Sequence, residues 1–192
     1  MRTFAKDRTS ATFRHQLGPI AGYAYDYTKR LSLEPGLPRL KIAHTLRNTG
    51  TKPISTRVYN HNFLTFGGTG IAQDIALSTP FSIKSANPPP AAAARIENNK
   101  VVYAKRVVDR ERVSLGIEGF GPTAADHRFY IENPSLGAGV QIIGDRPLFR
   151  AALWSIRAVM AIEPFVQIDV APGAESSWSQ TYDYWAGRPE RT

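Results

Sequence analysis

Cysteine is absent from the 192 residues of the chain, which excludes disulfides, thiolate catalysis and cysteine metal sites. No apolar run approaches the roughly 20 residues that a membrane-spanning helix needs. The first eight residues also lack the continuous apolar stretch of a secretion signal. We therefore expect no membrane partner, and a cytoplasmic location is favoured for the chain as given, although the lack of cysteine fits either compartment.

Acidic residues are fewer than basic ones, and the formal net charge is +8. A nucleic-acid-binding domain would usually concentrate such an excess in a stripe or patch. Here the basic residues are scattered, and acidic side chains interrupt their densest cluster, residues 105–112. The pattern indicates a solvated pair of strands and predicts no nucleic-acid partner, while an anionic substrate stays compatible with the charge.

Short segments of alternating apolar and polar residues follow one another along the chain, and no long amphipathic helix interrupts them. Turn signals separate them, above all Asn48–Pro53 and Ala171–Gly173. Many short strands joined by such turns predict an all-β fold, an antiparallel β-sandwich, in one domain over residues 1–192. The predicted strands cover residues 20–33, 39–47, 54–64, 101–109, 112–118, 127–132, 138–143, 158–170 and 176–185.

Strand periodicity assigns faces to the segment 158–170, because successive side chains of a strand point to opposite sides. One set is apolar and predicts the buried face: Met160, Ile162, Pro164, Val166, Ile168 and Val170. The opposite set contains Glu163 and Phe165. Glu163 is therefore expected to point away from the core, beside an aromatic ring.

The segment 54–64 carries Arg57, Tyr59, His61 and Phe63 on one face. Aromatic rings pack against the C–H faces of sugars, while Arg and His reach hydroxyls. A site for a polar ligand is one interpretation, and an exposed amphipathic strand is the other. The same periodicity puts Asn60 on the opposite face unless a bulge intervenes.

Two motifs in this order resemble the aldose 1-epimerase superfamily, whose members are galactose mutarotase-like. The first is the turn Asn48-Thr49-Gly50-Thr51-Lys52-Pro53 followed by Tyr59-Asn60-His61-Asn62-Phe63. The second is Ile162-Glu163-Pro164-Phe165, followed by Pro172-Gly173, Trp178 and Tyr182. Asn62 departs from the family pattern, which has Tyr at that position. Family members are normally longer on the N-terminal side, so the sandwich is expected to lack N-terminal strands, and the open sheet edges would permit a homo-oligomer.

The resemblance implies an isomerase of carbohydrate metabolism that interconverts the α and β anomers of a small-molecule sugar. It implies that Glu163 is the catalytic base and His61 the catalytic acid. Side chains placed across one cleft, about a sugar ring apart, would favour this function. Acid and base suffice for this reaction, so no organic cofactor or metal is expected. The expected substrate-binding neighbours are Arg57, Tyr59, Asn60, Trp154 and Arg157, and Trp154 is equally compatible with the core.

Two alternatives stay open from the sequence. One is a non-catalytic carbohydrate-binding sandwich that keeps the aromatic face. The other is a basic nucleic-acid module, for which no basic stripe interleaved with aromatic residues is seen. His44 shares its face with Leu40, Ile42 and Leu46 and is interpreted as a core histidine. The four histidines lack the short spacing of a zinc site.

Overall fold

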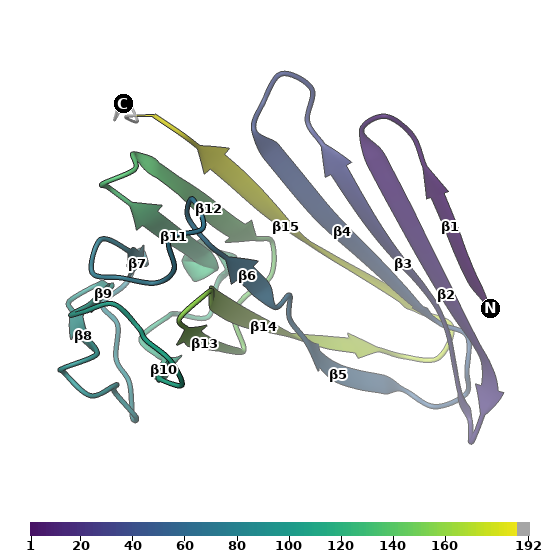
Figure 1. The fold of residues 1–192 in the computed structure, drawn as a ribbon. Helices are drawn as coiled ribbons and strands as arrows, with labels where there is room; N and C mark the ends of the chain where they lie inside the picture. Colours follow the sequence, from purple (N-terminus) through teal and green to yellow (C-terminus); the bar gives the residue numbers. More distant parts are fainter. Residues whose placement is uncertain (188–192) are drawn as a thin grey trace.

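The computed structural model describes residues 1–187, which form two antiparallel sheets and one short 3-10 helix, Ala124–Asp126 (Figure 1). The larger sheet has the order β1 (Arg2–Lys6), β2 (Ser10–Ile20), β3 (Tyr23–Leu33), β4 (Arg39–Asn48), β15 (Glu175–Trp185), β12 (Ala138–Gly144), β11 (Arg128–Asn133), β7 (Ala76–Ser78), β9 (Lys100–Tyr103), β8 (Ala94–Glu97). The smaller sheet has the order β10 (Arg112–Ile117), β13 (Arg150–Ile156), β14 (Met160–Val170), β5 (Ile54–Val58), and β6 (Asn62–Leu64) pairs with β14. The predicted all-β sandwich is confirmed. Among the described residues, no helix is long and apolar enough to cross a membrane.

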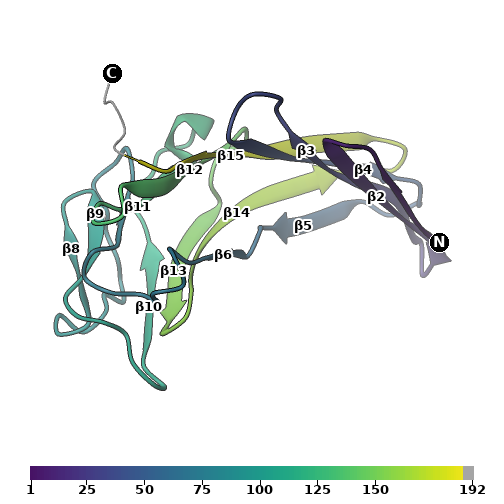
Figure 2. The ribbon, with the colours of Figure 1, turned by 45° about the horizontal axis from the view of Figure 1, so that its top comes forward.

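The two sheets lie over one another, with β3, β4 and β15 in one layer and β5 and β14 in the other (Figure 2). The turn Asn48–Pro53 carries the chain from one layer to the other. Buried Asn48 donates from Nδ2 to the carbonyls of Lys52 (2.8 Å) and Val170 (2.9 Å), and its Oδ1 accepts from the Gly50 amide at 3.0 Å. A Cβ at Gly50 would lie 2.6 Å from backbone atoms of residues 22 and 24, so only glycine fits.

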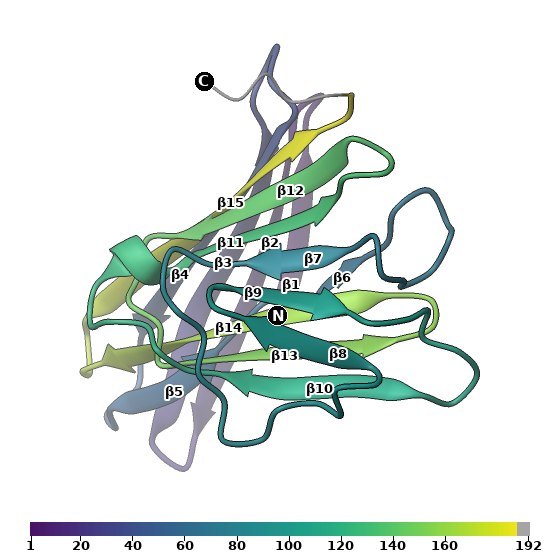
Figure 3. The same cartoon turned by 90° about the vertical axis from the view of Figure 1, so that its left-hand side faces the viewer.

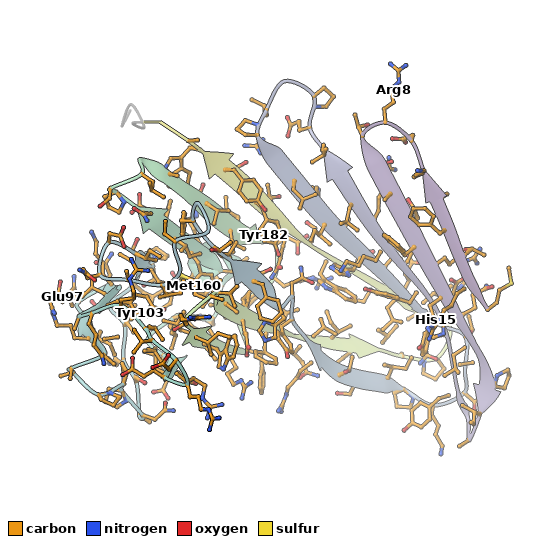
Figure 4. The ribbon with its side chains drawn as sticks, viewed as in Figure 1. Arg8, His15, Glu97, Tyr103, Met160 and Tyr182 are labelled. Atoms are coloured by element: carbon orange, nitrogen blue, oxygen red, sulfur yellow. The ribbon has the colours of Figure 1, made fainter. Side chains whose placement is uncertain are left out.

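The hydrophobic core fills the space between the sheets in the half of the molecule farthest from β1. Tyr103 and Met160 lie in this dense half (Figure 4), which also holds the short strands β7, β8 and β9 (Figure 3). A smaller cluster around Leu46, Val166 and Trp178 lies beneath β5. The predicted buried face of β14 is confirmed, because Met160, Ile162, Val166, Ile168 and Val170 are all 4% exposed or less.

Several features of the fold differ from the sequence prediction. The short strands β7 and β8 were not predicted, and the predicted strand 101–109 ends at Tyr103. Strands β1 and β2 occupy residues for which no strand was predicted, because their polar and apolar residues do not alternate cleanly. Strand β13 was also missed, between the predicted strands 138–143 and 158–170. The predicted strand 54–64 is broken into β5 and β6, and residues 59–61 lie outside regular pairing.

His44 lies in the interior, as predicted, and it packs in a row of aromatic rings. Its ring is parallel to that of Trp178, with centroids 5.0 Å apart and an interplanar angle of 3°. The His44 Nδ1 atom lies 2.7 Å from the Tyr27 hydroxyl. The side chain is only 6% exposed, so the histidine has a polar partner on one nitrogen and apolar contact over its face.

Acid is expected to destabilise the fold through this histidine. Burial lowers the pKa of His44 from 6.5 to about 4; the ammonium of Lys29 adds to the effect and the Asp145 carboxylate opposes it. Burial also lowers the pKa of His127. The unfolded chain therefore takes up these protons first, and the free energy of unfolding falls as pH drops from about 6.5 to about 4.

We expect His44 alone to account for a loss on the order of 2 kcal/mol in the free energy of unfolding. This is less than the full conversion of its pKa shift, because the ring borders a cavity open to solvent screening. Urea unfolding at several pH values between 7 and 4 measures this. The variant His44→Gln should show a flatter pH dependence. A free energy of unfolding that stays constant over this range would contradict the prediction.

Candidate active site

His61 and Glu163 meet on the outer face of the smaller sheet. Glu163 points outward from β14, because its neighbours Ile162 and Pro164 point into the core. His61 lies in the break between β5 and β6. Its Nε2 atom is 3.1 Å from Oε1 of Glu163, and the side chains are 36% and 16% exposed. The two residues from distant motifs therefore form one solvent-accessible pair of proton-handling groups.

Their separation differs from the sequence expectation. A gap of about a sugar ring between them would favour the implied function, whereas the structure brings them into direct contact. The two groups therefore approach a ligand from the same side. This arrangement still suits an anomeric centre, because the anomeric hydroxyl and the ring oxygen are both bonded to one carbon.

Small residues continue the row in which Glu163 lies. Ala152 pairs with Glu163 from β13, and Gly116 pairs with Ala152 from β10. Larger groups border this row: Trp154 and Phe63 beside Ala161 on one side, Arg150, Phe165 and Tyr59 on the other. Because Gly and Ala rise little above a sheet, the row is a low floor between aromatic side chains. A flat floor of this kind beside polar groups is suited to the apolar face of a sugar.

Two aromatic rings fix the imidazole of His61. The ring of Phe63 stacks on it, with centroids 4.2 Å apart and an angle of 25°. The ring of Trp154 meets it edge-on, with centroids 5.8 Å apart and an angle of 82°. These contacts restrict the imidazole to an orientation in which Nε2 points at the carboxylate.

A buried polar network holds the backbone on both sides of His61. The Nδ2 atom of Asn60 donates to Oε1 of Gln180 at 2.6 Å and to the Tyr182 hydroxyl at 3.2 Å. The Tyr182 hydroxyl donates to Oδ1 of Asn62 at 2.6 Å. Burial raises the pKa of Tyr182 to about 12, so this hydroxyl stays a donor at neutral pH. We refer to Asn60, Asn62, Gln180 and Tyr182 as the interior clamp, because they anchor a segment that lacks strand pairing.

The interior clamp was not predicted from the sequence. Tyr182 was noted only as part of a motif, and Asn60 was expected to bind substrate. The structure separates Asn60 from His61, since its side chain points between the sheets. The periodicity of residues 54–64 already indicated this direction. Ala152 and Gly116 were missed because β13 was missed, and a site prediction from periodicity needs the strand first.

Of the other predicted site residues, some lie beside the His61–Glu163 pair and others do not. Trp154 is brought to His61, and the ring of Tyr59 lies 4.1 Å from that of Phe165. The guanidinium of Arg57 lies over Phe149, 3.9 Å from the ring centroid. Arg157 falls in the turn between β13 and β14, where its carbonyl accepts from the Ile71 amide. No side-chain contact joins Arg157 to the pair among the described residues.

The His61–Glu163 pair belongs neither to the cavity between the sheets nor to a metal-binding cluster among residues 1–187. A cavity of about 550 Å³ lies between the sheets, and neither His61 nor Glu163 lines it. Within residues 1–187 no group of three or more His, Asp or Glu side chains is placed to hold a metal ion. The pair itself offers a carboxylate and an imidazole on an open surface, which is a composition suited to general acid–base chemistry.

No protein-family model and no curated protein sequence matches the chain. Solved structures do. A galactose mutarotase related enzyme from Lactobacillus acidophilus has a TM-score of 0.72 at 12% identity, over 100% of this chain and 73% of that one. A galactose mutarotase-like protein from Lactobacillus casei has a TM-score of 0.65 at 13% identity, over 96% and 73%.

A homologue of GalM/aldose epimerase from C. elegans has a TM-score of 0.67 at 12% identity, over 96% of this chain and 68% of that one. Across the matched structures of this kind, the chain spans from 53% to 73% of the other chain's length. At such identities the likeness concerns the fold. The chain has the galactose mutarotase-like fold.

Proposed function

We propose that this protein is a sugar 1-epimerase, an isomerase of carbohydrate metabolism that interconverts α and β anomers by opening the ring. The observation that carries the proposal is the contact between His61 Nε2 and Glu163 Oε1, 3.1 Å apart on an accessible face. The fold adds support, because structural neighbours are galactose mutarotase-like. The sugar would lie on the floor beside Ala152, with aromatic side chains around it.

In this mechanism Glu163 takes the proton of the anomeric hydroxyl while His61 gives a proton to the ring oxygen. The bond from C1 to the ring oxygen breaks, and the open-chain aldehyde forms. After rotation about C1–C2, the aldehyde oxygen accepts the proton from Glu163 and the released hydroxyl returns one to His61. The ring closes in the other anomer, and both side chains end in their starting state.

The substrate class follows from the charge around the floor. Arg57 and Arg150 each lie over an aromatic ring at the border of this face, and the chain carries a net charge of +8. A sugar with an anionic substituent, such as a sugar phosphate, would be attracted to this surface. We therefore propose sugar phosphates as substrates alongside neutral aldoses.

The test is the rate at which a pure anomer reaches equilibrium. Polarimetry follows freshly dissolved α-D-glucose and α-D-galactose, and exchange NMR follows their 6-phosphates. We expect at least one of these sugars to equilibrate faster with the protein than in the same dilute buffer. If none does although sugar binds, the non-catalytic carbohydrate-binding alternative, which the 60% exposed ring of Phe63 favours, replaces the proposal.

The variant His61→Gln gives the residue-level prediction for this function. Glutamine keeps a hydrogen-bonding group near Glu163 but cannot protonate the ring oxygen, so we expect a fall in kcat of about 10²–10⁴-fold with little change in KM. His15→Gln is the control, because His15 lies on β2 of the other sheet. Equal activity of His61→Gln and the wild type would contradict the role of His61.

A further inference from the structure

A cavity between the two sheets lies on the opposite side of the smaller sheet from the His61–Glu163 pair. It measures about 550 Å³, which is within the range of small-molecule sites. Strands β3, β4 and β15 form one wall, and β5 forms the other with the side chains of Ile54, Thr56 and Val58. Atoms of Arg57 and Tyr59 border it too, because β5 is an edge strand.

One wall of this cavity carries three aromatic side chains, Tyr27, His44 and Trp178, whose rings stack on one another. Strand pairing sets Lys29, His44 and Trp178 side by side on β3, β4 and β15. The rings of His44 and Trp178 are parallel, and the ring of Tyr27 lies 6.4 Å from that of Trp178 at an angle of 26°. The opposite wall is aliphatic, with Val58 among its side chains. Because the stacked rings cover one another's faces, a flat apolar ring in the cavity would meet their edges on one side and the aliphatic side chains on the other.

The charged side chains that line this cavity differ in whether they already have partners. The Asp145 carboxylate is already engaged, since it accepts from the amide and the hydroxyl of Ser179, each at 2.8 Å. Lys29 is half-buried and forms no ion pair within residues 1–187. The guanidinium of Arg146 binds the carbonyl of Ser177 at the same cavity. Within residues 1–187, Arg57 and Arg146 also border the cavity without an ion pair, but each is hydrogen-bonded to a neutral group. Lys29 has no such contact in the described part of the chain, so its ammonium is the cation with the fewest competing partners.

We propose that this cavity binds a small molecule with a flat apolar ring and one carboxylate. The ring packs between the edges of Trp178 and His44 and the aliphatic wall of β5, and the carboxylate pairs with Lys29. The ligand is distinct from the sugar of the outer face, because the cavity wall from β5 and β14 separates the two sites. The proposal does not depend on the epimerase function.

Saturation-transfer NMR with 2-naphthoate and with its uncharged counterpart 2-naphthamide tests this site. We expect 2-naphthoate to bind with a Kd of about 0.1–1 mM and the amide to bind about tenfold more weakly. The variant Lys29→Met, which keeps the aliphatic stem, should weaken the carboxylate about tenfold and leave the amide unchanged. Lys41→Met is the matched control, since Lys41 is exposed on the other face of β4.

A second variant locates the ligand independently of charge. Val58→Trp places a large ring in the cavity and should abolish the binding of both probes, while circular dichroism and the thermal midpoint show that the variant folds. Three results would overturn the proposal. These are no binding of 2-naphthoate at 5 mM (about five times the upper expected Kd), equal affinity of Lys29→Met and wild type, or binding that is lost in Phe63→Ala instead.

Discussion

Glutamine in place of Glu163 is expected to lower the rate of anomer interconversion by about 10²–10⁴-fold while sugar binding persists. Glutamine has nearly the same shape as glutamate but cannot accept the proton of the anomeric hydroxyl. Its amide can still contact His61, which lies 3.1 Å from the carboxylate in the native protein. The loss should therefore appear in kcat, with KM within a few-fold of wild type.

Asp169→Asn is the matched control for this variant. Asp169 lies on the same strand and the same face, six residues further along β14, and it is exposed. It bonds to Gln167 at the far end of the strand from His61. We expect unchanged kcat for Asp169→Asn. A Glu163→Gln protein that keeps the wild-type rate would show that this carboxylate is not the base.

Phenylalanine in place of Tyr182 is expected to reduce both stability and turnover through the interior clamp. The hydroxyl bonds to Asn60 and Asn62, which flank His61. Its removal leaves the buried Oδ1 of Asn62 without a donor, while Asn60 keeps its bond to Gln180. The cost should be about 1–3 kcal/mol in the free energy of unfolding. Because residues 59–61 have no strand pairing, the imidazole should also lose its fixed position, and kcat should fall about tenfold.

Two comparisons separate positioning from simple destabilisation. Tyr184→Phe removes a hydroxyl from the same face of β15, but Tyr184 is 40% exposed, so stability and kcat should stay near wild type. A core variant such as Ile168→Val should lose about 1 kcal/mol without a change in kcat well below its melting temperature. If Tyr182→Phe behaves like Ile168→Val, Tyr182 has a structural role only.

The sequence was sufficient for the fold class and for the two faces of β14. The apolar residues of β14 recur at every second position, and the Asn48 side chain bonds to Gly50 and Lys52 within its own turn. Both signals come from residues close together in the chain, so the sequence alone reveals them. Strand β13 could not be recognised in the same way, because Ala151 and Ala152 give it little contrast between faces. The small floor beside Glu163 depends on that strand and therefore also lay beyond the sequence.

The contact between His61 and Glu163, unlike the faces of β14, depends on residues that are far apart in the chain. The order of the two motifs suggested that they act together, but their distance depends on the break between β5 and β6. That break is held by Gln180 and Tyr182, more than 100 residues further along the chain. Interactions of such sequence separation leave no periodic signal. For the same reason the cavity beneath β5, lined by residues of β3, β4, β5, β14 and β15, was not predicted.

A crystal structure of the protein with a bound aldose, or with its 6-phosphate, tests the central claim most directly. We predict the ring oxygen within about 2.6–3.2 Å of His61 Nε2 and the anomeric hydroxyl within the same distance of the Glu163 carboxylate. A sugar whose anomeric carbon lies away from both side chains, or one bound only in the cavity between the sheets, would contradict it.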